Sequence, residues 1–189
     1  MPHRGNVYQS VIFAAQQSLD ATGELPTTPS ALAAQSGLDE TQISSIFRTT
    51  ADIYEGLLYH ATTLLNDALR QGVIDAATDD PVRQMLSIGR SYLAWAEHNP
   101  ALFRLIFSSA KTDVADPDLQ AAGTIAYRHL VWLIEQLGGG EADVAALWAM
   151  SHGIADLASG QRLRSVSDRP DAEREAMIRN LIERVLPRA

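Results

Sequence analysis

The chain has 189 residues, of which 46% are hydrophobic and 20% are charged, so it is long enough for a packed core and too apolar for wholesale disorder. It contains no cysteine, which excludes disulfides, thiolate nucleophiles and cysteine-based metal sites and makes the cytoplasm the default location. The net charge of −8 is not segregated and gives no basic face for nucleic acid, and the first residues match neither a signal peptide nor a membrane-spanning helix.

The first 50 residues predict three helices. Apolar residues at i, i+4 spacing define the first helix, which Gly23 closes. These residues are Val7, Val11, Ile12, Ala15 and Leu19. Thr28 is a good N-cap for a second, short helix, with Pro29 at its first position. Gly37 then turns the chain, and Asp39 caps a third helix in which Gln42 occupies the capping-box position. The inward side of this helix is predicted at Ile43, Ile46 and Phe47.

The remaining 139 residues predict six further helices and no strand. Thr49 caps a long fourth helix that we expect to end at Gly72, and residues 78–81 form a loop whose Pro81 opens the next helix. The later helices are predicted from 81 to about 99, 100 to 109, 119 to 137, 141 to 160, and from about 171 to Pro187. The sequence therefore predicts an all-α protein of about nine helices. The charges of the last helix, Arg174, Glu175, Arg179, Glu183 and Arg184, are interpreted as a solvated face.

A short helix, a glycine turn and a second short helix form the plan in which the later helix enters the major groove of DNA. The spacing of the head residues resembles the tetracycline-repressor (TetR) family of transcriptional regulators. The matching residues are Gly23, Thr27, Thr28, Leu32, Ala33, Gly37, Leu38, Ile43, Phe47 and Thr49. The resemblance implies a helix-turn-helix DNA-binding head at residues 1–50 and a ligand-binding and dimerisation domain at residues 51–189. It also implies a homodimer that packs through its last two helices.

The residues expected to contact DNA are mostly uncharged. They are Thr28, Thr41, Gln42, Ser44, Ser45, Arg48, Thr49 and Thr50. Gln42 can pair with adenine, Arg48 with a phosphate, and the amides at the start of the fourth helix can hold another phosphate. The family's Tyr, its His or Tyr, and its Lys are replaced here by Ser44, Ile46 and Thr50, and the first 60 residues carry a net charge of −4. A second interpretation is that these residues are caps and surface on a head that no longer binds DNA.

Aromatic side chains gather on the helices of the predicted body. Residues 91–109 and 147–163 resemble one TetR branch, with Tyr92, Asn99-Pro100, Phe103-Arg104 and a Trp-x-x-x-His-Gly motif at Trp148, His152 and Gly153. The resemblance implies a small-molecule pocket between the body helices; plain hydrophobic core is the other interpretation of these aromatics. The candidate pocket residues are Met85, Tyr92, Trp95, Phe103, Phe107, Tyr127, Trp132, Trp148 and His152.

His152 lies next to Ser151 and four residues before Asp156, but helical neighbours point in different directions and Ser151 lacks a nucleophile elbow. We interpret His152 as a core histidine satisfied by a hydrogen bond, with Gly153 allowing close helix packing. His98, His129 and His152 lack an i, i+4 pair and are weak as a metal site. We therefore expect no catalytic residues, no metal and no cofactor, and no enzyme activity.

These observations predict a ligand-responsive transcriptional regulator, a repressor, that binds palindromic operator DNA as a homodimer and responds to a small-molecule effector whose identity does not follow from the sequence. The alternative is a ligand-binding or interaction dimer derived from that family whose DNA binding is impaired. The expected partners are double-stranded DNA, a small-molecule effector and a second copy of the chain, with no membrane.

Overall fold

The computed structural model describes residues 4–26, 28–108, 117–163 and 168–186. Over these ranges the chain forms nine helices and no strand, which confirms the prediction of an all-α protein. The helices are α1 (Arg4–Thr22), α2 (Pro29–Ser36), α3 (Glu40–Ser44), α4 (Thr50–Ala76), α5 (Pro81–His98), α6 (Pro100–Ser108), α7 (Pro117–Gln136), α8 (Glu141–Ser159) and α10 (Asp171–Val185). Thr27 and the predicted last residues of two helices, Ser109 and Pro187, lie outside the described residues.

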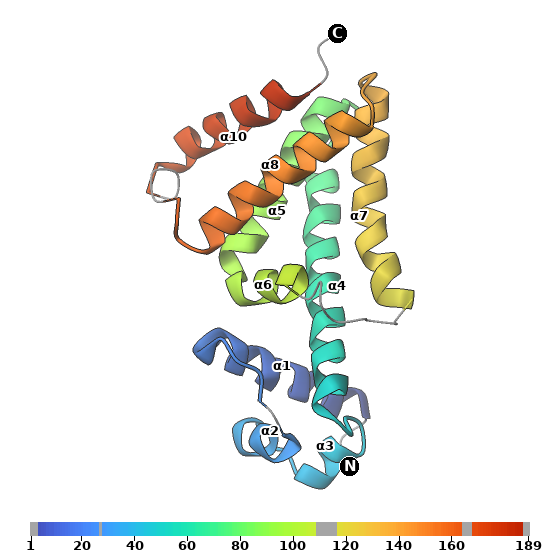
Figure 1. Cartoon of the computed structure of the whole chain (residues 1–189), viewed down its shortest axis with the longest axis vertical. Helices are drawn as coiled ribbons and strands as arrows, with labels where there is room; N and C mark the ends of the chain where they lie inside the picture. The colour runs from blue at the N-terminus through green and yellow to red at the C-terminus, as the bar shows by residue number, and fades with distance from the viewer. Residues whose placement is uncertain (1–3, 27, 109–116, 164–167, 187–189) are drawn as a thin grey trace.

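Helices α1, α2 and α3 pack together at one end of the molecule, around the start of α4 (Figure 1). Their ends are set by the residues that the sequence singled out. Gly23 has a φ of 74°, and its amide donates a hydrogen bond to the carbonyl oxygen of Leu19. The hydroxyl of Thr28 accepts a hydrogen bond from the amide of Ala31. Gly37 has a φ of 66°, a conformation that costs glycine little, and this residue turns the chain from α2 into α3.

Helix α4 is the longest helix described and runs from the head into the body (Figure 1). It extends to Ala76, so the prediction that it ends at Gly72 is wrong. Gly72 lies inside the helix, at the point where α5 packs closely against it. A Cβ atom at Gly72 would stand 3.0 Å from Ile88 Cα and 2.8 Å from Ser91 Oγ. This glycine therefore serves the contact between two helices instead of ending one.

Helix α10 lies against α5 and α8. Its buried residues Ile178 and Ile182 supply the apolar part of the contact. Arg174 adds an ion pair with Glu97 of α5 at 3.1 Å, and both side chains are more than two-thirds buried. The interpretation of the charges of this helix as a solvated face is therefore wrong for Arg174, whereas Arg179, Glu183 and Arg184 are exposed as expected. A charge at the edge of an apolar stripe can help to fix a helix on its neighbour.

One continuous hydrophobic core joins the head to the body. It extends from Val11 of α1 and Phe47 through Leu57 of α4 to Phe103 of α6 and Ile182 of α10. Helix α6 touches both α1 and α4, so the head and the body meet at this short helix as well as through α4 itself. Across the described ranges, no helix combines the length and the apolar character needed to cross a bilayer.

Candidate functional site

Helix α3 presents a polar outer side. Ile43 and Phe47 are buried, and the ring of Phe47 stacks on Tyr8 of α1 with their centroids 5.2 Å apart. This packing fixes the rotation of the helix, because Ile43 can face the core in only one orientation. The side chains that remain exposed include Thr41, Ser44, Ser45 and Arg48, and Gln42 is partly exposed. The structure thus leaves the predicted DNA-contacting residues of this segment at least partly exposed on the head.

Two acidic residues near α3, Asp39 and Asp52, are engaged in capping, whereas Glu40 at the start of the helix is exposed. The Asp39 carboxylate accepts a hydrogen bond of 2.7 Å from the amide of Thr41, and hydrogen bonding by Thr41 lowers the pKa of Asp39. No reciprocal bond from Gln42 accompanies this cap among the described hydrogen bonds, so the prediction of a capping box at Asp39 and Gln42 is wrong. A capping box forms instead at the start of the next helix, α4, where Thr49 Oγ1 accepts from the amide of Asp52 and Asp52 Oδ2 accepts from the amide of Thr49.

Asp52 occupies amides that the sequence assigned to a phosphate. Its carboxylate also accepts a hydrogen bond of 2.7 Å from the amide of Arg48, and the hydroxyl of Thr49 donates to Asp52 Oδ1 at 2.9 Å. These bonds, with that of the Thr49 side chain foremost, lower the pKa of Asp52, so its negative charge persists to a lower pH than that of a free aspartate. The sequence carried this signal as Thr49-x-x-Asp52, but only Thr49 was recognised as a cap.

Four of the predicted pocket residues form a cluster between α5, α6 and α8. The hydroxyl of Tyr92 and Nδ1 of His152 share a hydrogen bond of 3.1 Å. The imidazole stacks on Phe103 at 5.4 Å and meets Phe107 edge-on at 4.4 Å between centroids. Burial raises the pKa of Tyr92, so the phenol stays protonated and retains its hydrogen-bonding hydroxyl. The cluster joins a partly buried polar pair to an aromatic surface.

The other predicted pocket residues lie apart from this cluster or elsewhere in the core. Tyr127 of α7 and Trp148 of α8 form an edge-to-face pair and are 41% and 38% exposed. Trp132 is 45% exposed and stacks on His129. Met85 and Trp95 are buried. The indole N–H of Trp95 is buried and has no hydrogen-bond acceptor among the described residues, which leaves a donor that a water or a ligand oxygen would satisfy.

The surroundings of His152 agree with a histidine held by a hydrogen bond, but the role expected for Gly153 is wrong. Among the described residues, no atom lies within 4 Å of a Cβ built at Gly153, so the absence of a side chain there permits no close helix contact within this chain. The described residues also contain no group of three or more His, Asp or Glu side chains placed to hold a metal ion.

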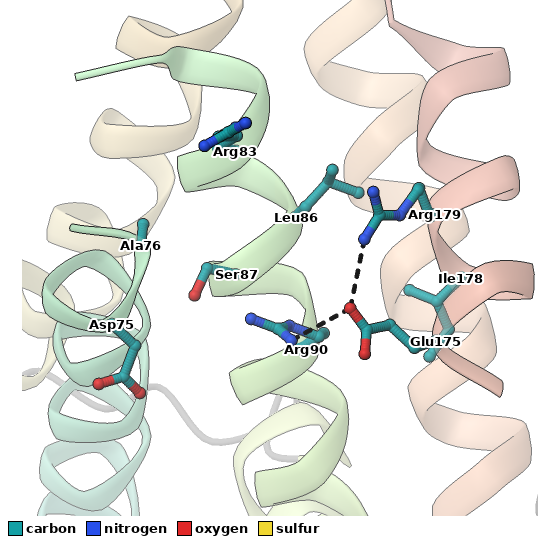
Figure 2. A pocket seen from close by; sticks show the side chains of 9 residues that line it. All are labelled: Asp75, Ala76, Arg83, Leu86, Ser87, Arg90, Glu175, Ile178 and Arg179. Carbon is teal, nitrogen blue, oxygen red and sulfur yellow. Dashed lines mark hydrogen bonds and ion pairs between the residues drawn. The ribbon is translucent and has the colours of Figure 1, made fainter. Parts of the chain in front are cut away.

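A cavity of about 330 Å³ opens between the end of α4, residues 83–90 of α5 and residues 175–179 of α10 (Figure 2). None of the predicted pocket residues lines it. Its lining residues are Asp75, Ala76, Arg83, Leu86, Ser87, Arg90, Glu175, Ile178 and Arg179. Periodicity did not indicate this cavity, because α10, which supplies Glu175 and Arg179, is far from α4 and α5 in the sequence.

A head of three helices, a long connecting helix and a helical body form the fold of a class of α-helical regulators. The sequence model of the family described as "Tetracyclin repressor-like, C-terminal domain" matches residues 85–181, just over half of the chain. The chain therefore belongs to the tetracycline-repressor-like (TetR-like) family. No protein of curated description shows significant sequence similarity to it.

Solved structures share this fold over nearly the whole chain. A protein of unknown function from Rhodococcus sp. RHA1 superposes with a TM-score of 0.80 at 20% identity, covering 96% of each chain. A TetR-like transcriptional regulator from the same organism gives 0.70 at 13% identity over 97% of each chain. The TetR-like regulator LfrR from Mycobacterium smegmatis, in complex with proflavine, gives 0.62 at 14% identity, covering 98% of this chain and 99% of that one.

Proposed function

We propose that the protein is a ligand-responsive transcriptional repressor that binds a palindromic operator as a homodimer. The observation that carries this proposal is the exposed polar side of α3, held at a fixed rotation by Ile43 and Phe47 at the end of the molecule away from the body. A helix that is locked on one side and polar on the other suits insertion into the major groove. DNA and ligand binding are typical of the TetR-like family to which the chain belongs.

DNA contact at this surface depends on side chains more than on helix-end amides, because Asp52 already bonds the amides of Arg48 and Thr49. Arg48 is exposed and supplies a cation for a phosphate. Gln42 and Thr41 supply uncharged donors and acceptors for base edges. Affinity of this kind carries a shallow dependence on salt, because few phosphates are neutralised. We propose a boundary near residue 50, with the head before it and the effector and dimer functions in residues 51–189.

An effector seated against the cluster of Tyr92, Phe103, Phe107 and His152 would act through α6. Phe103 and Phe107 belong to α6, and α6 touches both α1 and α4. A ligand that replaces the bond between Tyr92 and His152 and shifts α6 would therefore change the position of the head. Such a ligand lowers operator affinity only if it binds the shifted arrangement more tightly than the original one.

We propose that two chains pair through α8 and α10. Helix α8 exposes the large apolar side chain of Leu157, which is 38% accessible in the single chain, on the side of the helix opposite to Trp148. A twofold dimer would place two copies of α3 about 34 to 36 Å apart, one turn of DNA. Sedimentation velocity tests this arrangement: Leu157→Glu should dissociate the dimer, whereas Ile74→Glu, at a 61% exposed position on α4, should not. A monomeric wild-type protein would contradict the proposal.

DNA binding is tested with labelled duplexes that tile the DNA upstream of the protein's own gene, by fluorescence anisotropy from about 50 to 200 mM salt. We expect one duplex to bind, and Arg48→Gln to weaken binding and reduce the salt slope by about one. Arg70→Gln is the matched control, because Arg70 is 74% exposed on α4 and pairs only with its helical neighbour Asp67 among the ion pairs described.

Absence of binding to every duplex at the lowest salt, by a protein that is folded and dimeric, would refute the repressor function. It would favour the second candidate, a ligand-binding or interaction dimer with an impaired head. The specific observation that favours this candidate is Asp52, whose carboxylate holds a negative charge on the amides at the start of α4.

A further inference from the structure

The cavity between α4, α5 and α10 carries an unusual share of the positive charge of an acidic protein. Three arginines line it, Arg83, Arg90 and Arg179, against two acids, Asp75 and Glu175, which gives the lining a formal charge of +1. Arg83 also pairs at 3.8 Å with Asp80, which is not part of the lining, so Arg90 and Arg179 are the cations on which the site depends. The whole chain has a net charge of −8. The lining therefore favours an anion over a cation in a molecule whose remaining surface favours the reverse.

Two of these guanidinium groups share one carboxylate (Figure 2). Glu175 Oε1 accepts from Arg90 at 3.2 Å and from Arg179 at 3.3 Å. Each guanidinium presents five N–H donors in a planar fork, and one nitrogen of each contacts Glu175. The three side chains are between 42% and 53% exposed, so water screens the two ion pairs and their net stabilisation is small. A second oxyanion can thus join or replace Glu175 at little cost.

Asp75 on the facing wall competes less for these arginines. Its carboxylate accepts a hydrogen bond of 2.8 Å from the side-chain amide of Gln71 on its own helix. The wall also includes apolar atoms from Ala76, Leu86 and Ile178. The volume of about 330 Å³ is near the lower end of small-molecule sites, which span about 300 to 1,000 Å³.

We propose that this cavity binds a small organic anion: its carboxylate pairs with Arg90 and Arg179, and its short apolar group lies on Leu86 and Ile178. A planar carboxylate matches the guanidinium fork, and the apolar wall selects a carboxylate with a hydrocarbon group over an inorganic anion. Glu175 is then an internal competitor that the ligand displaces. This binding site goes beyond the proposed function and does not depend on it, since the assay needs neither DNA nor an operator.

The test uses the full chain and three probes of known chemistry: hexanoate, hexylammonium and inorganic phosphate. Titration calorimetry gives the affinity, and amide chemical shifts locate the site. We expect hexanoate to bind more tightly than phosphate, hexylammonium not to bind, and the largest shift changes at Ser87, Arg90 and Ile178. Equal binding of hexanoate and hexylammonium, or shift changes centred elsewhere, would overturn the proposal.

Two substitutions in the cavity have opposite expected effects. Arg90→Gln should weaken hexanoate binding about tenfold, because it removes a charge-assisted hydrogen bond. Glu175→Gln should strengthen binding severalfold, because the competing carboxylate is gone. Arg179→Gln provides a second test at a more exposed position if Arg90→Gln unfolds, and Arg70→Gln should match the wild type. A Glu175→Gln variant that is folded and binds hexanoate no better than the wild type would refute the competitor mechanism and, with it, the proposed pose.

Discussion

Gly72→Ala tests whether the crossing of α4 and α5 is fixed by the absence of a side chain. The new Cβ would stand 2.8 Å from Ser91 Oγ, 3.0 Å from Ile88 Cα and 3.2 Å from the carbonyl oxygen of Ser87. The serine side chain can rotate away, but two of the three atoms belong to the backbone of α5. The helices must therefore separate by several tenths of an ångström.

The magnitude follows from two opposing terms. Overpacking of a tight contact costs about 1 to 3 kcal/mol, and backbone atoms place Gly72 in the upper part of this range. Alanine gains about 1 kcal/mol over glycine in a helix interior. The expected net loss is about 1 to 2 kcal/mol, which in a chain of this size corresponds to a fall in Tm of about 2 to 8 °C.

The matched control is Gly153→Ala in the middle of α8. Gly153 lies one turn before Leu157 on the proposed dimer surface, so both glycine variants are made in the Leu157→Glu chain, which serves as the wild type of this comparison. Within its described residues nothing lies within 4 Å of the added Cβ, so the helix-propensity gain should make Gly153→Ala more stable by up to about 1 kcal/mol. Both variants are compared with the wild type by denaturant unfolding followed by circular dichroism, at one protein concentration because self-association changes apparent stability. A Gly72→Ala variant as stable as the wild type would refute the packing argument.

Three further changes probe the cap of α4 and the polar pair of the body. Thr49→Ala should lower the free energy of unfolding by about 1 kcal/mol, because the N-cap bond is lost; an unchanged Tm would contradict the cap assignment. Hydrogen bonds depress the pKa of Asp52 in the folded state, so its stabilisation is complete above its unfolded pKa of about 3.9 and is lost as the pH falls through the folded value. Asp52→Asn should therefore show a shallower loss of stability below about pH 4 than the wild type, and parallel acid unfolding curves would exclude this role. Tyr92→Phe should cost about 1 kcal/mol and shift the ring resonances of His152, whereas unchanged resonances would deny the hydrogen bond.

The sequence predicted where the helices begin and end better than it predicted which helices pack against one another. Gly23, Thr28, Gly37 and Thr49 act locally, through φ angles and hydrogen bonds within a few residues, so each could be recognised without the fold. Gly72 is a glycine like those that end helices, but it serves a different role, which is to let α5 pack closely against α4. A sequence pattern cannot reveal which helix crosses at that point.

The same limit applies to the predicted pocket residues of the body. Aromatic spacing identified Tyr92, Phe103 and His152, which meet in the structure, but it grouped them with Tyr127 and Trp132, which face outward in the single chain. Helical periodicity reports which side of a helix is apolar and not whether that side meets the core, a ligand or a second subunit.

The charged cavity shows the complementary failure. Polar residues on a helix satisfy the pattern of a solvated face whether or not another helix brings a partner charge to them. Arg90 and Glu175 are 85 residues apart, and their pairing at 3.2 Å arises only because Ile178 and Ile182 dock α10 on its neighbours. The sequence thus shows which residues of this protein are charged. Which of these charges meet in one cavity depends on how the apolar residues pack the helices together.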